Sequence, residues 1–568
     1  MRASALAGLL TAALLLGGTG CASDARGGEP MAPVEAVVAP QPVKAPEAEP
    51  PPAAPVAAVL DADRLQAALA LVPAPDHRAG LEAFYASTAY RTVFTTGSGL
   101  TPAGERVAAA LRGVGAEALE PATFHVPRID ALVAAPAAEA MPELEVLLAD
   151  GLMRYGRAMR PRLASDEAAL RPVQEQLLRD VAGASGADGV DAVLEALRPR
   201  GPQYGRLMEA LGRYEAIVAA GGWPGKLPKI KRPKRGEEEE YKPGYKRYPE
   251  KLIRPIKERL AAERLYAGPI DDQWDEAFTE SIRRYRRNNL LGERAIIDYV
   301  MVEAMKVPAA FRLGELKVNL QRLREDPVGT SDYYVYVNVP EFVGEVWDKG
   351  EQKLLFRVIT GSRKKYRDKK DRKFHFPDAT PEMIDRVERV VFNPSWTVPA
   401  RIRTQLHKQA AGKPNFWKEN GYTIIPTGSG EMIKQAPGPT NALGQFKFLF
   451  PNDHDVYMHD TNRKDLFREE VRAFSHGCIR VENPDRLAHY LLSREDDAWT
   501  ERRIRINAAG DTEMSQPLEH GPAVFLDYVT VRVGDDGDVV FLWDIYHRDL
   551  EAVEAQYGVT FEPDAYYP

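Results

Sequence analysis

The segment VYMHDTNRKDLFREEVRAFSHGCIRVEN, residues 456–483, brings together His459, Ser475, His476, Gly477, Cys478 and Arg480. A cysteine thiol is only slightly ionised at neutral pH, so a reactive cysteine needs a neighbouring base or positive charge. We therefore take Cys478 as the candidate nucleophile. His459 and His476 are the two candidate bases.

We prefer His459 as the base for a geometric reason. His476 lies two residues before Cys478 on the same extended segment, where its side chain shares a face with the sulfur but is poorly placed for in-line proton transfer. His459 follows the run DVYM in a different segment, so it can meet the sulfur from a neighbouring strand. The turn residues Asp460 and Asn462 follow it and are suited to holding the imidazole.

The residues around Cys478 suggest how a reaction centre is completed. Gly477 permits unusual backbone dihedrals, so the N–H groups of Gly477 and Cys478 are candidate donors to an oxyanion, although a simple tight turn also fits. Arg480 shares the face of Cys478 and is suited to a thiolate or a substrate carboxylate, unless it is a solvated surface side chain. Candidate pocket walls, each of which also fits an ordinary core or turn position, are Tyr457, Met458, Trp396, Asn393 and Ser475.

The sequence on both sides of this segment predicts a β-rich domain over residues 330–568. This region contains β-branched and aromatic runs that are separated by turn residues, namely YYVYVNVP, KLLFRVITG, RVVFNPSWTVP, AVFLDYVTVRV and DVVFLWDIY. The last two runs predict a C-terminal β extension. Residues 399–425 are too long for a hairpin turn and partly helical in character, which predicts an excursion from the sheet that acts as a lid.

The preceding half of the chain has helical periodicity. Stretches such as LEVLLADGLMRYGRAM and YGRLMEALGRYEAIV predict a helical domain over residues 61–225. Residues 226–252 combine a basic cluster, four glutamates and prolines, which is typical of a solvated linker or insertion. A small helical module is expected over residues 253–325. The predicted fold class is therefore multidomain α+β, with helical domains before a β-rich domain.

The N-terminus has the layout of an export signal. Arg2 precedes an apolar run over residues 3–16, and small residues end at Cys21, which predicts a signal peptide over residues 1–20 and a lipidated Cys21 at its cleavage site. Plain secretion is the alternative. Residues 21–60 are dominated by Pro and Ala and predict an extended tether. The chain has two cysteines, so Cys478 then has no disulfide partner, which raises the expectation of a reactive role, although composition alone still favours an inert buried thiol.

Charge and composition exclude some classes of partner. The chain has 568 residues, a net charge of -7 and 44% hydrophobic residues, which is enough for several packed cores. An acidic balance argues against nucleic acid, whose binding rests on Lys and Arg. Contact with a membrane is expected only through the N-terminal lipid anchor.

SHGCIR, preceded by HDTN, resembles the signature of the L,D-transpeptidase catalytic domain of the YkuD type. PGPTNALGQFKFLFPN and FNPSWTVP are also similar to that family, so the resemblance covers residues 332–492. GLEAFYASTAYRTVFTTGSGLTPAGERV resembles the scaffold domain of the large YcbB-like branch, and VFLDYVTVRVGDDGDVVFLWDIYHRD resembles its ending. In that branch a peptidoglycan-binding module occupies the place of residues 253–325, here in degenerate form, and a substrate-capping segment occupies the place of the excursion.

The resemblance implies a reaction and its partners. The Cys478 thiolate would attack the peptide bond before the terminal D-alanine of a peptidoglycan tetrapeptide stem, form a thioester and pass the stem to an amine, while His459 moves the proton. Carbapenem sensitivity, a periplasmic location and no cofactor are expected. Other cell-wall synthesis proteins are candidate partners.

Other interpretations remain open at this point. Sortases also order His, Cys and Arg on a β-barrel and also transpeptidate, but their motif text differs. A metal site is a second alternative, because its usual ligand types occur at His454, His459, His476 and Cys478. The third alternative is a wall-binding scaffold without turnover. The acceptor is equally open among a stem diaminopimelate, a free D-amino acid, water and a protein amine.

Overall fold

The computed structural model describes residue 60 and residues 62–72, 74–161, 167–232, 240–325, 331–370, 373–428 and 430–561. The predicted signal peptide, Cys21 and nearly all of the tether lie outside these residues. Within the described part of the chain, each helix is too short or too polar to cross a bilayer.

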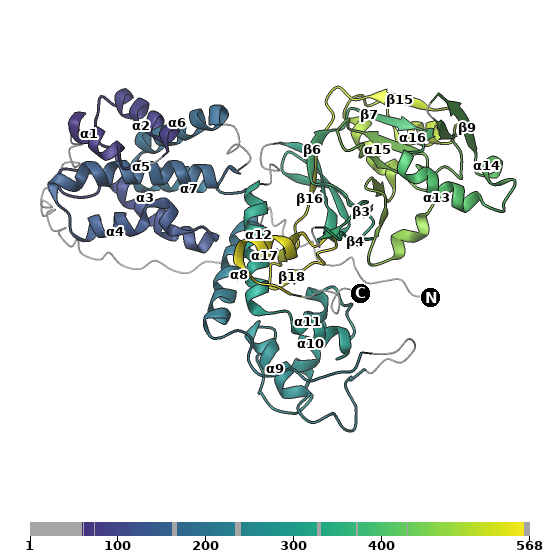
Figure 1. The fold of residues 1–568 in the computed structure, drawn as a ribbon, viewed down its shortest axis with the longest axis horizontal. Helices are drawn as coiled ribbons and strands as arrows, with labels where there is room; N and C mark the ends of the chain where they lie inside the picture. Colours follow the sequence, from purple (N-terminus) through teal and green to yellow (C-terminus); the bar gives the residue numbers. More distant parts are fainter. Residues whose placement is uncertain are drawn as a thin grey trace, which may run out of the picture. The chain divides into compact units, whose positions relative to one another are not determined.

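The first part of the chain is helical, as predicted (Figure 1). Its long helix α5 is buried along most of its length and forms the centre of an apolar core that includes Leu81, Val107 and Leu148. Local sequence sets the helix starts: Thr101 precedes α3 and accepts a hydrogen bond from the Gly104 N–H. The helices are α1 Ala62–Leu69, α2 Pro75–Ser87, α3 Pro102–Arg112, α4 Val126–Ala134, α5 Met141–Ala158, α6 Glu167–Gly183, α7 Gly186–Glu195 and α8 Pro202–Ala219.

A second helical group follows the charged segment. Asp275 caps α10 by accepting the Phe278 N–H at 2.6 Å, and the apolar faces of these helices share one core. The charged segment is not wholly solvated, because Tyr248 stacks on Trp274 with ring centroids 5.1 Å apart. Part of it, residues 233–239, lies outside the described residues. The helices are α9 Ile253–Ala262, α10 Glu276–Asn288, α11 Tyr299–Met305 and α12 Ala309–Glu325.

The last part of the chain is β-rich, so the predicted fold class is confirmed. Eleven strands within the described residues form one mixed sheet, in the order β15-β7-β11-β12-β14-β3-β2-β1-β16-β6, with β13 paired to β3. Alternate side chains of these strands fill a core with α15 and α16. The elements are β1 Tyr333–Asn338, β2 Val343–Asp348, β3 Glu351–Gly361, β6 Met383–Arg386, β7 Arg389–Phe392, β11 Phe446–Leu449, β12 Met458–His459, β13 Ala473–Ser475, β14 Ile479–Val481, α15 Pro484–Ser493, α16 Glu501–Ala508, β15 Met514–Pro517 and β16 Ala523–Asp527.

Two smaller units leave this sheet. One is a short hairpin made by β4 Tyr366–Arg367 and β5 Phe374–His375. The other, which we call the cap, is the predicted excursion, and it runs on beyond residue 425 to residue 435. It has a small core of its own around Val398, Leu406 and Ile433. Its elements are β8 Trp396–Thr397, α13 Ala400–Ala410, α14 Phe416–Glu419, β9 Tyr422–Thr427 and β10 Gly430–Gln435.

The C-terminal segment connects the sheet to the helices. After β16, which pairs with β1, the chain forms the hairpin of β17 Val531–Val533 and β18 Val539–Phe541 and then α17 Arg548–Tyr557. Val531 and Phe541 share an apolar cluster with Leu207 of α8 and Leu316 of α12. Figure 1 shows α17 in yellow against α12 in teal. The predicted β extension is thus a hairpin and a helix that pack on the helical part.

Candidate active site

The register of two short parallel strands brings His459 and Cys478 to one face of the sheet. In β12 and β14, Met458 pairs with Ile479 and His459 pairs with Arg480. Side chains at alternate positions share a face, so Tyr457, His459, Cys478 and Arg480 point to one side, and Met458 and Ile479 point to the other. The predicted base and the predicted nucleophile thus lie on adjacent strands and share one face.

The imidazole of His459 is buried and oriented by the backbone. Its Nδ1 contacts the carbonyl oxygen of Asp460, and a carbonyl only accepts, so Nδ1 carries the proton and Nε2 keeps its lone pair. Burial, then the positive charges of Arg480 and Lys447, lowers the pKa of His459 to about 3, against a smaller opposing effect of the Asp460 carbonyl. At neutral pH His459 is therefore an uncharged imidazole with a free basic nitrogen.

Cys478 is half-buried beside Tyr457, and its Sγ lies 3.7 Å from the carbonyl oxygen of Asp455. Burial raises the pKa of the Cys478 thiol. Hydrogen bonds from Tyr457 and the charges of Arg401 and Lys447 act against this shift and favour the thiolate. The raised pKa of Cys478 and the lowered pKa of His459 both favour the neutral forms of thiol and imidazole over an ion pair.

The turn that carries Cys478 is closed by Ser475. The Ser475 hydroxyl donates to the Cys478 carbonyl at 2.5 Å and accepts the Gly477 N–H at 3.2 Å. Ser475 is therefore a buried turn residue here, not a pocket wall. The expectation that both N–H groups of Gly477 and Cys478 bind an oxyanion also changes, because the Gly477 N–H is already engaged. The Cys478 N–H is the candidate donor.

Gly477 has a φ of +111°, a conformation that L residues avoid. A Cβ built there meets only the Ala379 carbonyl at 3.6 Å and Arg401 at 3.7 Å, so the penalty for a side chain is conformational. We expect Gly477→Ala to destabilise the β-rich domain by about 1–3 kcal/mol, measured as a lower denaturation midpoint. Gly205→Ala, in helix α8 with open space around it, is the matched control and should be neutral or slightly stabilising. An unchanged midpoint for Gly477→Ala would contradict the expectation.

The second candidate base, His476, faces the cap. Its Nε2 lies 3.3 Å from the Gln405 Oε1 on α13, and its backbone carbonyl accepts from Arg401 on the same helix. Burial lowers the pKa of His476, with Asp378 acting in the opposite direction. His476 therefore connects the turn that carries Cys478 to the cap, whereas His459 shares the sheet face of Cys478.

Arg480 supplies positive charge on the site face. Its guanidinium is largely enclosed, and burial lowers its pKa. Its Nε is buried and has no hydrogen-bond partner among the described residues. An enclosed cation with a spare N–H is suited to an incoming carboxylate.

The remaining predicted pocket residues divide into two groups. Tyr457 faces the site, lies 5.6 Å from the His459 ring between centroids and is hydrogen-bonded by Trp396 of the cap. Met458 is fully buried in the domain core on the opposite face. Asn393 is buried and donates to the Asn507 carbonyl at 2.8 Å, so its amide holds neighbouring backbone. The site wall therefore contains Tyr457 and Trp396, while Met458 and Asn393 are structural.

Sequence reasoning missed three side chains that act on this site. Lys447 pairs with His459 across β11 and β12, and its Nζ lies 3.9 Å from the Tyr457 ring centroid. The alternation in QFKFLF predicts this position of Lys447, because Phe446 and Phe448 are core residues and the residue between them points to the opposite face. Arg401 and Thr380, whose hydroxyl donates to the Gly477 carbonyl at 2.9 Å, come from segments without such a signal.

The metal alternative requires at least three ligands around one point. In the described part of the chain, His, Cys, Asp and Glu side chains do not form such a group. His454 is exposed. The site is organised instead around one thiol and one imidazole.

Comparison with known proteins agrees with the geometry. Residues 332–512 match the L,D-transpeptidase catalytic domain of the YkuD family, and residues 79–211 match the Scaffold domain. A putative L,D-transpeptidase of Haemophilus influenzae is 32% identical over 257 residues, which are 42% of this chain and 48% of that protein. The chain thus spans about half the length of this relative.

A solved structure of an L,D-transpeptidase from Xylanimonas cellulosilytica aligns over 54% of this chain and 100% of that chain, with 12% identity and a TM-score of 0.16. The two domain matches and the Haemophilus relative confirm the resemblance predicted from HDTN and SHGCIR. The protein therefore carries a YkuD-type L,D-transpeptidase catalytic domain behind a Scaffold domain, in the YcbB-like arrangement.

Proposed function

We propose that this protein is a peptidoglycan L,D-transpeptidase that acts in cell-wall crosslinking or remodelling. Cys478 is the nucleophile, and the donor is a tetrapeptide stem that ends in D-alanine. The observation that supports this most is the common sheet face of Cys478 and His459 within a YkuD-type domain. The family match supports a reaction in the cell wall, and the strand register supports a thiol and an uncharged imidazole that share one face.

In the first step the Cys478 sulfur attacks the carbonyl carbon of the bond before the terminal D-alanine. The thiol proton passes to His459 Nε2, and the carbonyl oxygen becomes an oxyanion that faces the Cys478 N–H. When the C–N bond breaks, the imidazole returns the proton to the leaving amine. D-alanine departs and a thioester remains on Cys478.

In the second step an amine acceptor resolves the thioester. His459 removes a proton from the attacking amine, the C–S bond breaks, and the proton goes to the departing sulfur. The stem is joined to the acceptor through a new amide bond, and the thiol is regenerated. No redox or metal chemistry enters either step.

The positive charges around the site suggest how the donor is held. A stem that ends in D-alanine carries a terminal carboxylate, and Arg480 offers a buried Nε without a partner among the described residues. Lys447 lies on the same face. We propose that Arg480 binds this carboxylate, which favours donors that still retain D-alanine.

The exported location is also a proposal. The N-terminal pattern ending at Cys21 supports transfer to the periplasm and a lipid anchor there. We also propose that the helical module, residues 253–325, contacts the wall. Other cell-wall synthesis proteins are proposed as partners. Labelling with a lipid precursor, compared between the wild type and Cys21→Ala, tests the anchor.

The central experiment is incubation of the full chain with tetrapeptide-bearing muropeptides and a panel of acceptors. The panel contains a stem with a free diaminopimelate amine, a free D-amino acid and a protein amine, with water as the background acceptor. Chromatography with mass detection should show free D-alanine and one new product for each accepted amine. If every acceptor leaves the tetrapeptide intact while the thiol remains titratable, the proposed function is wrong.

A carbapenem gives an independent prediction. Its β-lactam carbonyl is strained and accepts a thiol, and the opened ring leaves a stable thioester on Cys478. The intact mass of the protein should increase by the mass of one drug molecule, and peptide mapping should place it at Cys478. An adduct that forms on another residue, or none at all, would contradict this assignment.

A further inference from the structure

The peptide bond between Gly477 and Cys478 is held from its carbonyl side by a residue outside the catalytic turn. The Thr380 hydroxyl donates to the Gly477 carbonyl at 2.9 Å and accepts the Gly361 N–H at 2.9 Å. Thr380 is fully buried. Its single hydroxyl proton therefore has a defined direction, toward Gly477.

This contact also orients an N–H group. The Gly477 carbonyl and the Cys478 N–H belong to one planar trans peptide, so they point in opposite directions. A carbonyl that is anchored on one side therefore aims the Cys478 N–H to the other. Gly477, at a φ of +111°, would otherwise allow this peptide to rotate with little resistance.

Thr380 is itself held by the C-terminal segment. The Thr380 N–H donates to the Tyr546 hydroxyl oxygen at 3.3 Å, and its carbonyl accepts from Arg548 at 2.9 Å. The Tyr546 hydroxyl donates in turn to the Gly361 carbonyl at 2.6 Å. Both polar backbone groups of Thr380 are thus tied to residues beyond 332–512, the range that matches the YkuD family.

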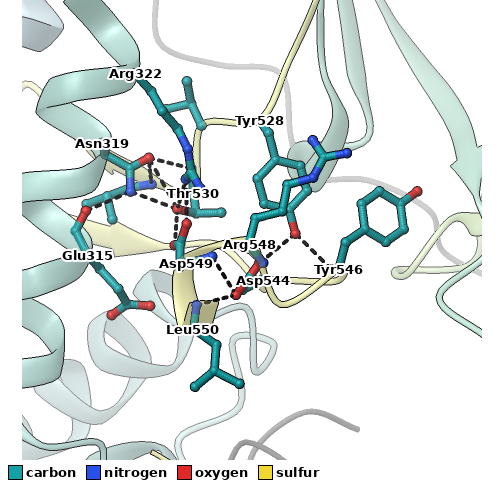
Figure 2. Close-up of polar contacts among 12 residues, drawn as sticks. Glu315, Asn319, Arg322, Tyr528, Thr530, Asp544, Tyr546, Arg548, Asp549 and Leu550 are labelled. Carbon is teal, nitrogen blue, oxygen red and sulfur yellow. Dashed lines mark hydrogen bonds and ion pairs between the residues drawn. The ribbon is translucent and has the colours of Figure 1, made fainter. Parts of the chain in front are cut away.

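The segment that supplies these contacts is held by several hydrogen bonds of its own (Figure 2). Asp544 accepts the Tyr528 hydroxyl at 2.7 Å and the Arg548 N–H at 2.8 Å, which fixes the first turn of α17. Tyr528 stacks on Tyr546 with ring centroids 5.7 Å apart. Asp549 contacts Arg322 of α12. The support of Thr380 therefore extends from α17 to α12.

We propose that Thr380 is a positioning residue that aims the Cys478 N–H at the developing oxyanion, and that the C-terminal segment holds Thr380 for this task. The inference rests on the proposed acyl-transfer function. It predicts an effect on the tetrahedral intermediate and little effect on binding of the donor, because the oxyanion exists only along the reaction.

Thr380→Val tests the proposal, since valine keeps the shape of threonine and removes the hydroxyl. We expect kcat for D-alanine release to fall by about 10- to 100-fold, with KM changed less than about twofold. Thr380→Ser keeps the hydroxyl and should stay within about threefold of the wild type. If Thr380→Val keeps the wild-type kcat, the proposal is wrong.

A second readout separates positioning from general damage to the fold. Alkylation of Cys478 by iodoacetamide displaces iodide and forms no oxyanion, whereas acylation by a carbapenem does. Thr380→Val should slow acylation and leave the alkylation rate unchanged. Equal slowing of both reactions would indicate a displaced thiol and would overturn the proposal.

Tyr546→Phe extends the test to the C-terminal segment. It removes the hydroxyl between Thr380 and Gly361 and should lower kcat in the same direction, by a smaller factor. Tyr333→Phe is the matched control, because the Tyr333 hydroxyl is buried in the same domain without a hydrogen-bond partner among the described residues. An unaltered Tyr546→Phe enzyme would remove the C-terminal part of the proposal. A wild type that releases no D-alanine would instead overturn the proposed function itself.

Discussion

Cys478→Ala is expected to release no measurable D-alanine from tetrapeptide muropeptides, a loss on the order of 10³-fold or more. The sulfur is the atom that becomes covalently attached to the stem, and the neighbouring side chains cannot replace it. Tyr457 is a phenol whose pKa is raised by burial, and His459 is enclosed. Discontinuous assay of free D-alanine against time, with wild-type protein in parallel, measures the effect.

The fold should tolerate this change. Cys478 is half-buried, and the turn around it is held by Ser475 and Thr380 through backbone groups, which alanine retains. The denaturation midpoint should therefore stay close to that of the wild type, and the carbapenem adduct should disappear. Cys478→Ser, which keeps a weaker nucleophile, should be almost as inactive. Retention of more than about a tenth of the wild-type rate in Cys478→Ala would show that another residue is the nucleophile.

The sequence was most informative where a residue type and a local pattern coincide. The β-branched runs after residue 331 predict strands because such side chains pack well on a pleated surface, and the sheet is built from them. Cys478 and His459 could be selected because the thiol chemistry requires a base and the motif offers only two histidines. The amphipathic stretches before residue 225 likewise predict the helices.

The pairing of strands could not be derived in this way. The parallel register of β12 and β14 joins segments only two and three residues long, and no local pattern specifies it. Thr380 reaches Gly477 across 97 positions in the sequence, and Arg401 reaches His476 across 75. Contacts of this kind depend on the whole fold, so the contacts of Thr380 and Arg401 with the turn at Cys478 were not predictable.

For two side chains the sequence analysis left a pocket position and a structural position open, although local rules decide between them. Strand alternation puts Met458 on the face opposite His459, so both cannot line one pocket. Asn393 has a φ of +48°, a conformation that asparagine tolerates at turns, and its side chain secures backbone there. The cap continues to residue 435 as a hairpin of β9 and β10. Many side chains of these two strands are exposed, so the sequence lacks the alternating pattern that marks a strand, and the predicted excursion ended at residue 425.

His459→Ala is expected to lower kcat by about 10²–10⁴-fold, the range for a general base. The residual rate should rise with pH, because hydroxide then generates the thiolate that the imidazole no longer produces. His459→Gln is a closer match in volume and tests whether packing alone explains the loss. A steady-state comparison of both variants with the wild type measures the effect. Activity within about threefold of the wild type in His459→Ala would make His476 the candidate base.

The pH dependence of the wild type follows from the lowered pKa of His459. Burial, with Arg480 and Lys447 nearby, holds this pKa near 3, so the imidazole remains a base throughout the range from pH 7 to pH 5. The kcat/KM for D-alanine release should therefore lack an acid limb near 6.5, the ordinary histidine value. The stability of the fold should depend on pH in the same direction. The unfolded chain binds a proton at His459 more readily than the folded chain, so folding stability is lost as the pH falls from about 6.5 toward 3.

Substitution of Arg480 tests whether its charge lowers the pKa of His459. Arg480→Gln removes the second-largest cause of the lowered pKa of His459, so its acid limb should move upward, toward 6.5. Arg480→Lys keeps the positive charge and should leave the acid limb where the wild type has it, even if donor binding weakens. An acid limb that is unaffected by Arg480→Gln would mean that burial and Lys447 set the protonation of His459 without Arg480. A wild-type limb near 6.5 would mean that the imidazole is solvated in the working enzyme, against the burial seen here.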